Sequence, residues 1–224
     1  ETFHRRLSLR KHLQMANFMY SNNFYDFIEI GTADYDTLIQ KADDTHKGIS
    51  IDPFRNFLDK LPNKKGCTKI CSAIYDKEGE TDIFYVTDDD IKNHNLPDWI
   101  KWSSSIHSPH PFVLQILNEI GLDPDTILKT KTVPITRLKT IIDQYKIDEI
   151  KILKIDAEQS DDIILIDYFN CCKDEGYPLP FFIQYEHVAL SPRRRNHILG
   201  IAVKMGYMVT QEGEENSTLV KQTQ

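Results

Sequence analysis

The sequence predicts one α/β domain, spanning residues 1–224, organised around a mainly parallel, doubly wound sheet. Three observations support this fold class. Short apolar runs of strand length alternate with amphipathic runs of helix length along most of the chain. The central runs are almost continuously apolar, as is typical of parallel strands that are buried on both faces. Two strand-like runs separated by a turn close the sequence, which predicts an antiparallel C-terminal hairpin.

The first part of the chain alternates between helix and strand patterns. Apolar residues at helical spacing predict an N-terminal helix over about residues 4–22. We then expect strands at 24–31, 48–52, 68–76 and 78–86, and helices at 35–42 and 53–61. Pro53 is expected in the first turn of helix 53–61, where a missing N–H is tolerated. The strand at 78–86 follows a glycine-containing turn, so we expect it to pair antiparallel with a neighbour.

Residues 88–131 interrupt this alternation. They contain both tryptophans, Trp99 and Trp102, together with three histidines and four prolines. We interpret them as an inserted, lid-like region with one short helix at 111–120.

The alternation resumes after the insertion. We expect an extended segment at 132–138, strands at 149–156 and 179–187, and helices at 138–146, 161–176 and 191–206. Gly176 is expected to end one helix, and Ser191 followed by Pro192 to begin the next. The hairpin strands are "YMVTQEG" and "STLVKQ".

The composition is that of a globular protein and argues against two classes of partner. The net charge is −7, whereas proteins that bind nucleic acid usually carry a basic face, so a nucleic-acid partner is not expected. The basic clusters at 5–11 and 193–195 are interpreted as solvated helix faces. No apolar stretch approaches the ~20 residues that a membrane span needs.

The four cysteines have neither zinc-ribbon nor redox spacing, so we expect free thiols. The polar, basic first ten residues do not have the pattern of a secretory signal. Together these features predict a cytoplasmic location.

Two carboxylates follow the first two strands, at the edge of the sheet where ligands bind in this fold class. Asp52 ends the second strand and follows Gly31 by 21 residues, close to the ~20 expected of an acid that binds ribose hydroxyls. This spacing predicts a cofactor that contains a nucleoside. Capping of the following helix is the alternative role for Asp52.

The first turn, "EIGTADY", favours a cationic cofactor over a dinucleotide. It contains only Gly31, although a pyrophosphate needs several free backbone amides and no nearby carboxylate. Glu29 and Asp34 would repel a pyrophosphate but would attract the ammonium and sulfonium groups of S-adenosylmethionine. We therefore expect S-adenosylmethionine, with an NAD-dependent, sugar-modifying enzyme as the alternative.

The sequence resembles the FkbM-type S-adenosylmethionine-dependent methyltransferases over roughly residues 24–221. The matching segments are "FIEIGTAD", "GISIDP", "CSAIYDKEG", "VPITRL", "ILKIDAEQSD" and "FFIQYEH", in the order and about the spacing of that family. The most specific is Lys154-Ile155-Asp156-Ala157-Glu158, which is similar to the family's K-I-D-x-E signature.

The resemblance implies a class I methyltransferase (Rossmann-like) fold and O-methylation of a sugar, glycolipid or natural-product hydroxyl. It assigns Glu29 and Gly31 to the first cofactor motif and Asp52 to the ribose hydroxyls. It also places Ser72 and Ala73 near the adenine, and Asp156 and Glu158 at the mouth of the active site.

Three candidate catalytic residues follow central strands: Asp156, Glu158 and His187. The two carboxylates can face the same side of an extended turn, where they could orient the acceptor hydroxyl, take its proton or hold a divalent metal. Bound Mg²⁺ is an alternative that the sequence does not favour, so no metal ligand is assigned. His187 could deprotonate the acceptor or be a structural histidine, and Glu186 beside it is a candidate for substrate contact.

The expected acceptor is a small molecule or a glycan. Trp99, Trp102, His107 and His110 could form a lid that stacks on a sugar face, or an aromatic core that anchors the insertion. Two alternatives to a sugar methyltransferase also stay open. The single glycine of the first turn is compatible with a binding scaffold that has lost activity, and an RNA methyltransferase is disfavoured by the acidic net charge.

Overall fold

The computed structural model describes residues 23–213 and 215–222. The helix predicted over residues 4–22 lies outside the described residues. All four cysteines carry free thiols. None of the described helices combines the length and the apolar character that crossing a membrane requires.

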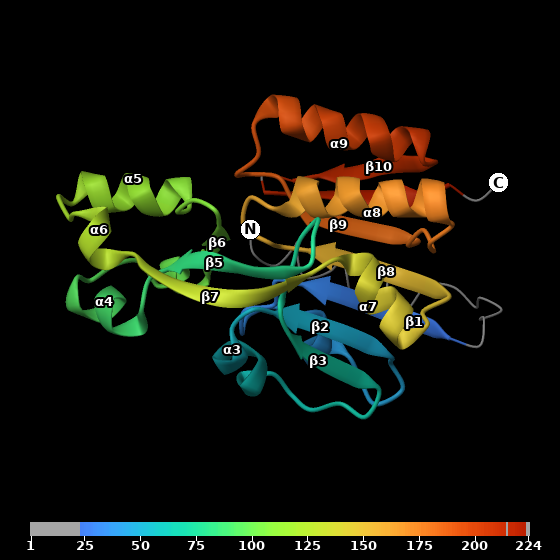
Figure 1. The fold of residues 1–224 in the computed structure, drawn as a ribbon, viewed down its shortest axis with the longest axis horizontal. Coiled ribbons are helices and arrows are strands. Elements are labelled where there is room, and N and C mark those ends of the chain that lie inside the picture. The colour runs from blue at the N-terminus through green and yellow to red at the C-terminus, as the bar shows by residue number, and fades with distance from the viewer. Residues whose placement is uncertain (1–22, 214, 223–224) are drawn as a thin grey trace.

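A sheet of seven strands forms the centre of the fold (Figure 1). Its order is β10-β11-β9-β8-β1-β2-β3, and every neighbouring pair is parallel except those of β11, which runs antiparallel to both β9 and β10. This confirms the predicted fold class and the C-terminal hairpin. The bounds are β1 Phe24–Ile30, β2 Gly48–Asp52, β3 Cys67–Cys71, β8 Glu149–Ile155, β9 Phe182–Glu186, β10 Tyr207–Glu212 and β11 Asn216–Lys221.

Helices cover both faces of this sheet, as a doubly wound fold requires. The larger core lies on the face covered by α7 (Leu138–Tyr145), α8 (Asp161–Glu175) and α9 (Pro192–Lys204). A smaller core, which includes Phe27 and Ile152, lies under α2 (Leu38–Lys41) and α3 (Arg55–Lys60). The next residues along these strands, Ile28 and Leu153, belong to the larger core.

The caps of two long helices agree with the sequence. The Ser191 hydroxyl accepts a hydrogen bond from the Arg194 N–H, with Pro192 at the first position of α9, and Gly176 ends α8 in a left-handed conformation. Pro53, in contrast, precedes α3 instead of occupying its first turn. The Asp52 carboxylate accepts the Phe54 N–H, so the helix begins only at Arg55.

A second sheet, with order β4-β7-β5-β6, was not predicted. The expected strand 68–76 is divided at Ser72 into β3 and β4 (Ala73–Ile74), and β4 leaves the main sheet to pair with β7 (Lys129–Thr136). The strand expected at 78–86 is β5 (Gly79–Tyr85), and its antiparallel pairing is confirmed. Its partners are β7 and β6 (Ser105–Ile106), so the segments 78–86 and 132–138 do not extend the main sheet.

The β5–β7 ribbon carries the insertion away from the main sheet (Figure 1). Between these strands lie α4 (Asp88–Asn93), the 3₁₀ helix η1 (Asp98–Trp102), α5 (Pro111–Glu119) and α6 (Pro124–Ile127). The predicted helix 111–120 corresponds to α5. A separate aliphatic core, which includes Ile100 and Leu117, holds these helices together.

The strand order reverses between β1 and β8, which defines the switch point where ligands bind in such sheets. Ile30 pairs with Ile155, the last residue of each strand. Gly31 and Asp156 are therefore the first residues beyond the paired strands, and the turns that follow them start side by side.

The position of α9 over the larger core gives a test of the packing. Ile198 has no exposed surface, whereas Val203 of the same helix is 61% exposed. We expect Ile198→Ala to lower the free energy of unfolding by about 2–5 kcal/mol, because it leaves a cavity in the core. The control Val203→Ala should change it by less than about 0.5 kcal/mol. Urea denaturation measures both, and equal effects would contradict this packing.

Candidate functional site

A cavity of about 600 Å³ opens at the carboxyl ends of the central strands. Its wall combines the two turns at the switch point with the second sheet and the insertion. The residues that line it include Gly31, Ala33, Asp52, Ser72, Ala73, Ile74, Trp99, Trp102, His110, Asp156, Glu158 and Glu186. The cavity has the size of a typical small-molecule or cofactor site.

Gly31 is required where the first turn passes the end of β8. Its φ is +73°, and a Cβ atom at this position would lie 1.7 Å from the Asp156 carbonyl oxygen. Ala33, two residues further along the same turn, also has a positive φ, of 44°. The turn after β1 is thus a tight, left-handed bend pressed against the backbone of the turn after β8.

Asp52 connects this first turn to the second strand. Its Oδ2 accepts the Ala33 N–H at 2.8 Å, and its Oδ1 accepts the Phe54 N–H at 2.8 Å. Burial raises the pKa of Asp52 to about 6, although these backbone N–H groups oppose the shift. Asp52 therefore accepts hydrogen bonds from the backbone on both sides of it and lines the cavity at the same time. The N-cap of α3 is Phe54, so Asp52 does not cap that helix, and its contact with the ribose stays a prediction.

Ser72 and Ala73 lie on the cavity wall at the point where the chain leaves the main sheet. The Ser72 hydroxyl donates to the carbonyl oxygens of Pro134 at 3.0 Å and Ala73 at 3.1 Å. These hydrogen bonds hold the junction between β3 and β4 and turn the hydroxyl toward backbone acceptors.

Glu29 does not line the cavity. Its side chain has no exposed surface, and its carboxylate accepts the Leu38 N–H at 2.9 Å and the Lys154 ammonium at 3.2 Å. Burial raises the pKa of Glu29, and Lys154 opposes the shift. Glu29 therefore holds the N-terminus of α2 and pairs with the partly buried Lys154, and its contact with the cofactor stays a prediction.

Asp34 also lies outside the cavity lining, contrary to its expected role as a cofactor residue. Its carboxylate contacts the Lys60 ammonium at 2.7 Å and accepts the indole N–H of Trp102 at 2.6 Å. Burial raises the pKa of Asp34, but Lys60 and Trp102 outweigh that effect and lower it. The negative charge of Asp34 is thus balanced by Lys60, and its hydrogen bond with Trp102 links the first turn to the insertion.

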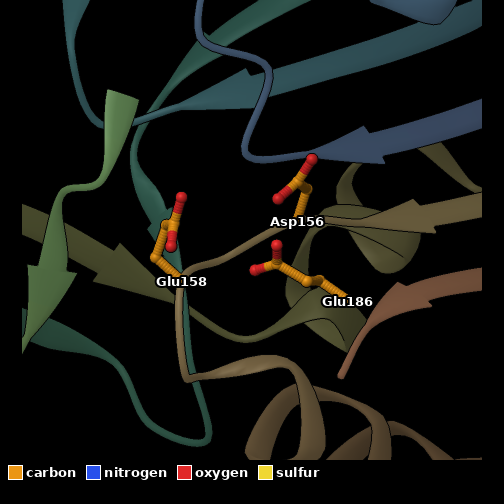
Figure 2. Close-up of side chains that lie close together, drawn as sticks. All are labelled: Asp156, Glu158 and Glu186. Atoms are coloured by element: carbon orange, nitrogen blue, oxygen red, sulfur yellow. The ribbon is translucent and has the colours of Figure 1, made fainter. Parts of the chain in front are cut away.

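Three carboxylates meet on the opposite side of the cavity. Asp156 and Glu158 project from the turn after β8, and Glu186 projects from the end of β9 (Figure 2). Each offers one oxygen, and these oxygens all lie within 4.8 Å of one another. The structure thus places the two predicted carboxylates together and adds Glu186, which the sequence suggested only as a substrate contact.

The electrostatic cost of this cluster is visible in the pKa values of its members. Burial raises the pKa of Asp156, and the nearby Lys154 opposes this shift. Burial also raises the pKa of Glu158, and His110 opposes that shift. Burial and the neighbouring Asp156 and Glu158 raise the pKa of Glu186 to about 10. The cluster therefore holds protons readily or requires a positively charged ligand.

Asp161 positions the cluster and was not recognised from the sequence as more than the start of a helix. Its two carboxylate oxygens accept the Ala157 N–H at 3.2 Å and the Glu186 N–H at 3.0 Å, so it connects the ends of β8 and β9. Arg194, from the basic cluster 193–195, pairs with Asp162 and donates to the Gln159 carbonyl oxygen at 2.8 Å. That arginine supports the turn that carries Glu158.

His187 is a structural histidine and is not part of the cavity wall. It is 4% exposed, and its Nδ1 lies 2.9 Å from the Ser217 hydroxyl of the neighbouring strand β11. The histidine that reaches the cavity is His110 of the insertion, whose Nε2 lies 3.1 Å from Glu158 Oε2. Only the tertiary fold brings this residue to the strand ends.

The two tryptophans of the insertion line the cavity, whereas the core of the insertion is made of aliphatic side chains. Trp102 stacks on Tyr35 of the first turn, with ring centroids 5.3 Å apart. Tyr35, Trp99, Phe112 and Val188 all line the cavity and are all at least 37% exposed. The mouth of the cavity therefore offers apolar surface, while the three carboxylates lie within it.

Comparison with known proteins gives one family. The model of the methyltransferase FkbM domain matches residues 18–173, which is more than half of the chain. No curated protein and no solved structure matches the chain significantly.

Replacement of Gly31 tests the close approach of the two turns. We expect Gly31→Ala to lower the free energy of unfolding by at least ~2 kcal/mol, because the left-handed backbone and the overlap with Asp156 both oppose a Cβ. Gly200→Ala, in the middle of α9 with open space around its Cβ, is the control and should stabilise the protein by about 0.5–1 kcal/mol. Chemical denaturation compares them, and a neutral Gly31→Ala would refute the contact.

Proposed function

Because the chain belongs to the FkbM methyltransferase family, we propose that it transfers a methyl group from S-adenosylmethionine to a hydroxyl oxygen of a small molecule or glycan. The family membership removes the support for the NAD-dependent alternative. The cofactor and the nature of the acceptor are the parts of this proposal that experiments have to test.

The observation that carries the proposal is the placement of Asp52. It lies at the end of β2, faces the first turn and lines a cavity of about 600 Å³. An ionised carboxylate has about four acceptor positions on its two oxygens. The N–H groups of Ala33 and Phe54 use two of them, and the Thr32 hydroxyl lies 3.5 Å from Oδ2. The capacity that is left, chiefly on Oδ1, supports a hydrogen bond from a ribose hydroxyl of a bound nucleoside.

The other proposed cofactor contacts follow from the wall beside Asp52. Gly31 lets the cofactor approach the backbone of the first turn, and Ser72 and Ala73 flank the region proposed for the adenine. The sulfonium end would then extend toward Asp156, at the neighbouring strand end. A positive charge there is favoured by the carboxylates of the cluster.

The acceptor hydroxyl is proposed to lie between the methyl group and the carboxylate cluster. In the reaction a C–O bond forms as the C–S bond breaks, the sulfur keeps the electron pair, and the hydroxyl proton passes to a carboxylate. Asp156 and Glu158 are the candidates, because burial raises their pKa values and makes them better proton acceptors. The apolar mouth formed by Tyr35, Trp99 and Phe112 supports an acceptor with a flat, weakly polar face, such as a sugar ring.

Calorimetry with S-adenosylhomocysteine, the demethylated form of the cofactor, tests the first half of the proposal. The wild-type protein should bind it, and Asp52→Asn should weaken binding by about tenfold or more, since hydrogen bonds to a charged group are worth roughly 1.5–3 kcal/mol. Asp59→Asn, an exposed acid on α3, is the control and should leave the affinity unchanged.

Absence of binding to the folded wild-type protein would sink the cofactor assignment. Mass spectrometry of sugars and glycans incubated with isotope-labelled S-adenosylmethionine tests the acceptor. Binding without transfer to any acceptor would instead favour the scaffold alternative.

The raised pKa of Asp52 makes cofactor binding pH-dependent. The ribose hydroxyls prefer the ionised carboxylate, which predominates only above its pKa of about 6. The affinity for S-adenosylhomocysteine should therefore be constant above about pH 7 and fall by up to tenfold per pH unit below pH 6. Asp52→Asn removes the titrating group, so its weaker binding should lose most of this slope. Equal slopes for both proteins would exclude Asp52 as the group responsible.

A further inference from the structure

We propose that Asp156, Glu158 and Glu186 bind one hard divalent cation of the Mg²⁺ or Mn²⁺ class, and that the acceptor hydroxyl completes the coordination of this ion. The first part depends only on the three carboxylates and their surroundings. The second part rests on the proposed function.

The three carboxylates lie close enough together to converge on a single ion. Oxygen ligands lie about 2.0–2.6 Å from Mg²⁺ or Ca²⁺, so ligands on opposite sides of one ion are roughly 4–5 Å apart. The oxygens of Asp156, Glu158 and Glu186 all lie within 4.8 Å of one another. Figure 2 shows the three side chains reaching toward the same space from two neighbouring strand ends.

Buried polar atoms without partners point to a missing ligand at this position. His110 is 4% exposed, and neither of its ring nitrogens has a hydrogen-bond partner. Its Nε2 nevertheless lies 3.1 Å from Glu158 Oε2, without the direction of a hydrogen bond. That separation is close to the ~3 Å between adjacent ligands of an octahedral ion with bonds of about 2.1 Å. Glu186 Oε2 is also buried without a partner.

The part of the chain that the structure describes supplies little positive charge to this cluster. The Lys154 ammonium lies 3.8 Å from Asp156 Oδ2, but it is closer to Glu29, at 3.2 Å. Among the described residues no other lysine or arginine forms an ion pair with Asp156, Glu158 or Glu186. Three clustered, partly buried carboxylates with one lysine nearby repel one another, and a divalent cation would offset that repulsion.

The donor set selects the kind of ion. Three carboxylate oxygens are hard ligands, which suit Mg²⁺, Mn²⁺ and Ca²⁺ better than ions that prefer sulfur. Three protein ligands would leave positions of a six-coordinate ion open for water and for an oxygen of the acceptor. An ion there would lower the pKa of a bound hydroxyl. Each carboxylate offers one oxygen to the ion, so the second oxygen of Asp156 or Glu158 would be left to accept the hydroxyl proton as the C–O bond forms.

Titration of the metal-free full chain with Mn²⁺ tests the site, with free Mn²⁺ measured by electron paramagnetic resonance and no cofactor present. We expect one ion per chain, displaced by Mg²⁺. Asp156→Asn and Glu186→Gln should each weaken Mn²⁺ binding by at least tenfold. Glu215→Gln removes a carboxylate that lines the same cavity outside the cluster, and it should change the affinity by less than about threefold.

Thermal denaturation separates loss of the site from loss of the fold. Mg²⁺ should raise the melting temperature of the wild-type protein and of Glu215→Gln, but not of Asp156→Asn or Glu186→Gln. Both cluster variants should melt, without metal, at or above the wild-type temperature, because Asp156→Asn removes a repulsive charge and Glu186→Gln leaves a neutral side chain of the same size. No Mn²⁺ binding to the wild-type protein, or binding that both cluster variants retain, would overturn the proposal.

The role of the ion is tested separately from the methyl transfer itself. Chelation by EDTA should abolish transfer and leave binding of S-adenosylhomocysteine within about threefold of its normal affinity. Full transfer activity in EDTA would disprove the role of the ion while leaving the proposed function intact. If the wild-type protein does not bind S-adenosylhomocysteine, the proposed function is contradicted, but the proposed metal site is not.

Discussion

The approach of Gly31 to the Asp156 carbonyl oxygen is the constraint on which the site depends. A Cβ on residue 31 would lie 1.7 Å from that oxygen, so the turns after β1 and β8 meet this closely only because the first contains glycine. The contact occurs at the switch point of the sheet, where both turns lead away from the same edge. The turn after β1 contains the Ala33 N–H that Asp52 accepts, and the turn after β8 carries Asp156 and Glu158. Because these two turns are in contact, the regions proposed for the cofactor and the acceptor are adjacent.

The acidic residues around this contact divide into two groups with different chemistry. Glu29 and Asp34 have lysine partners and hold the scaffold, through Lys154 and Lys60. Both lie outside the cavity lining, and their charges are balanced within the protein. The cluster of Asp156, Glu158 and Glu186 faces the cavity and is not balanced in this way. Partly buried carboxylates that repel one another next to a cavity are the pattern expected of a functional site.

The insertion contributes to the site by completing its wall. The β5–β7 ribbon carries η1 and α5 to the cavity, and the aliphatic core of the insertion packs them together. Trp102 is anchored through Asp34 and Tyr35 of the first turn, so the insertion is tied directly to the switch point. The insertion also places His110 beside Glu158. Differences in the acceptors of related proteins are expected to reside in this wall, since the carboxyl ends of the sheet are fixed by the fold.

The sequence by itself determined the parallel sheet, its C-terminal hairpin, and the acids at the ends of β2 and β8, because strand periodicity, glycine and turn residues are local signals. It also placed Gly31, Asp52, Ser72, Ala73, Asp156 and Glu158, all of which line the cavity. Only the tertiary structure decided which charges are paired within the protein. The sequence showed Glu29 and Asp34 beside the first turn, but their lysine partners lie 125 and 26 residues away along the chain. It named His187 as a candidate base and His110 only as part of the lid. In the structure His187 packs against Ser217, whereas His110 reaches Glu158 through a second sheet that the sequence did not reveal. Pairing between distant residues depends on strand order and side-chain direction, and neither is encoded within a short window of sequence.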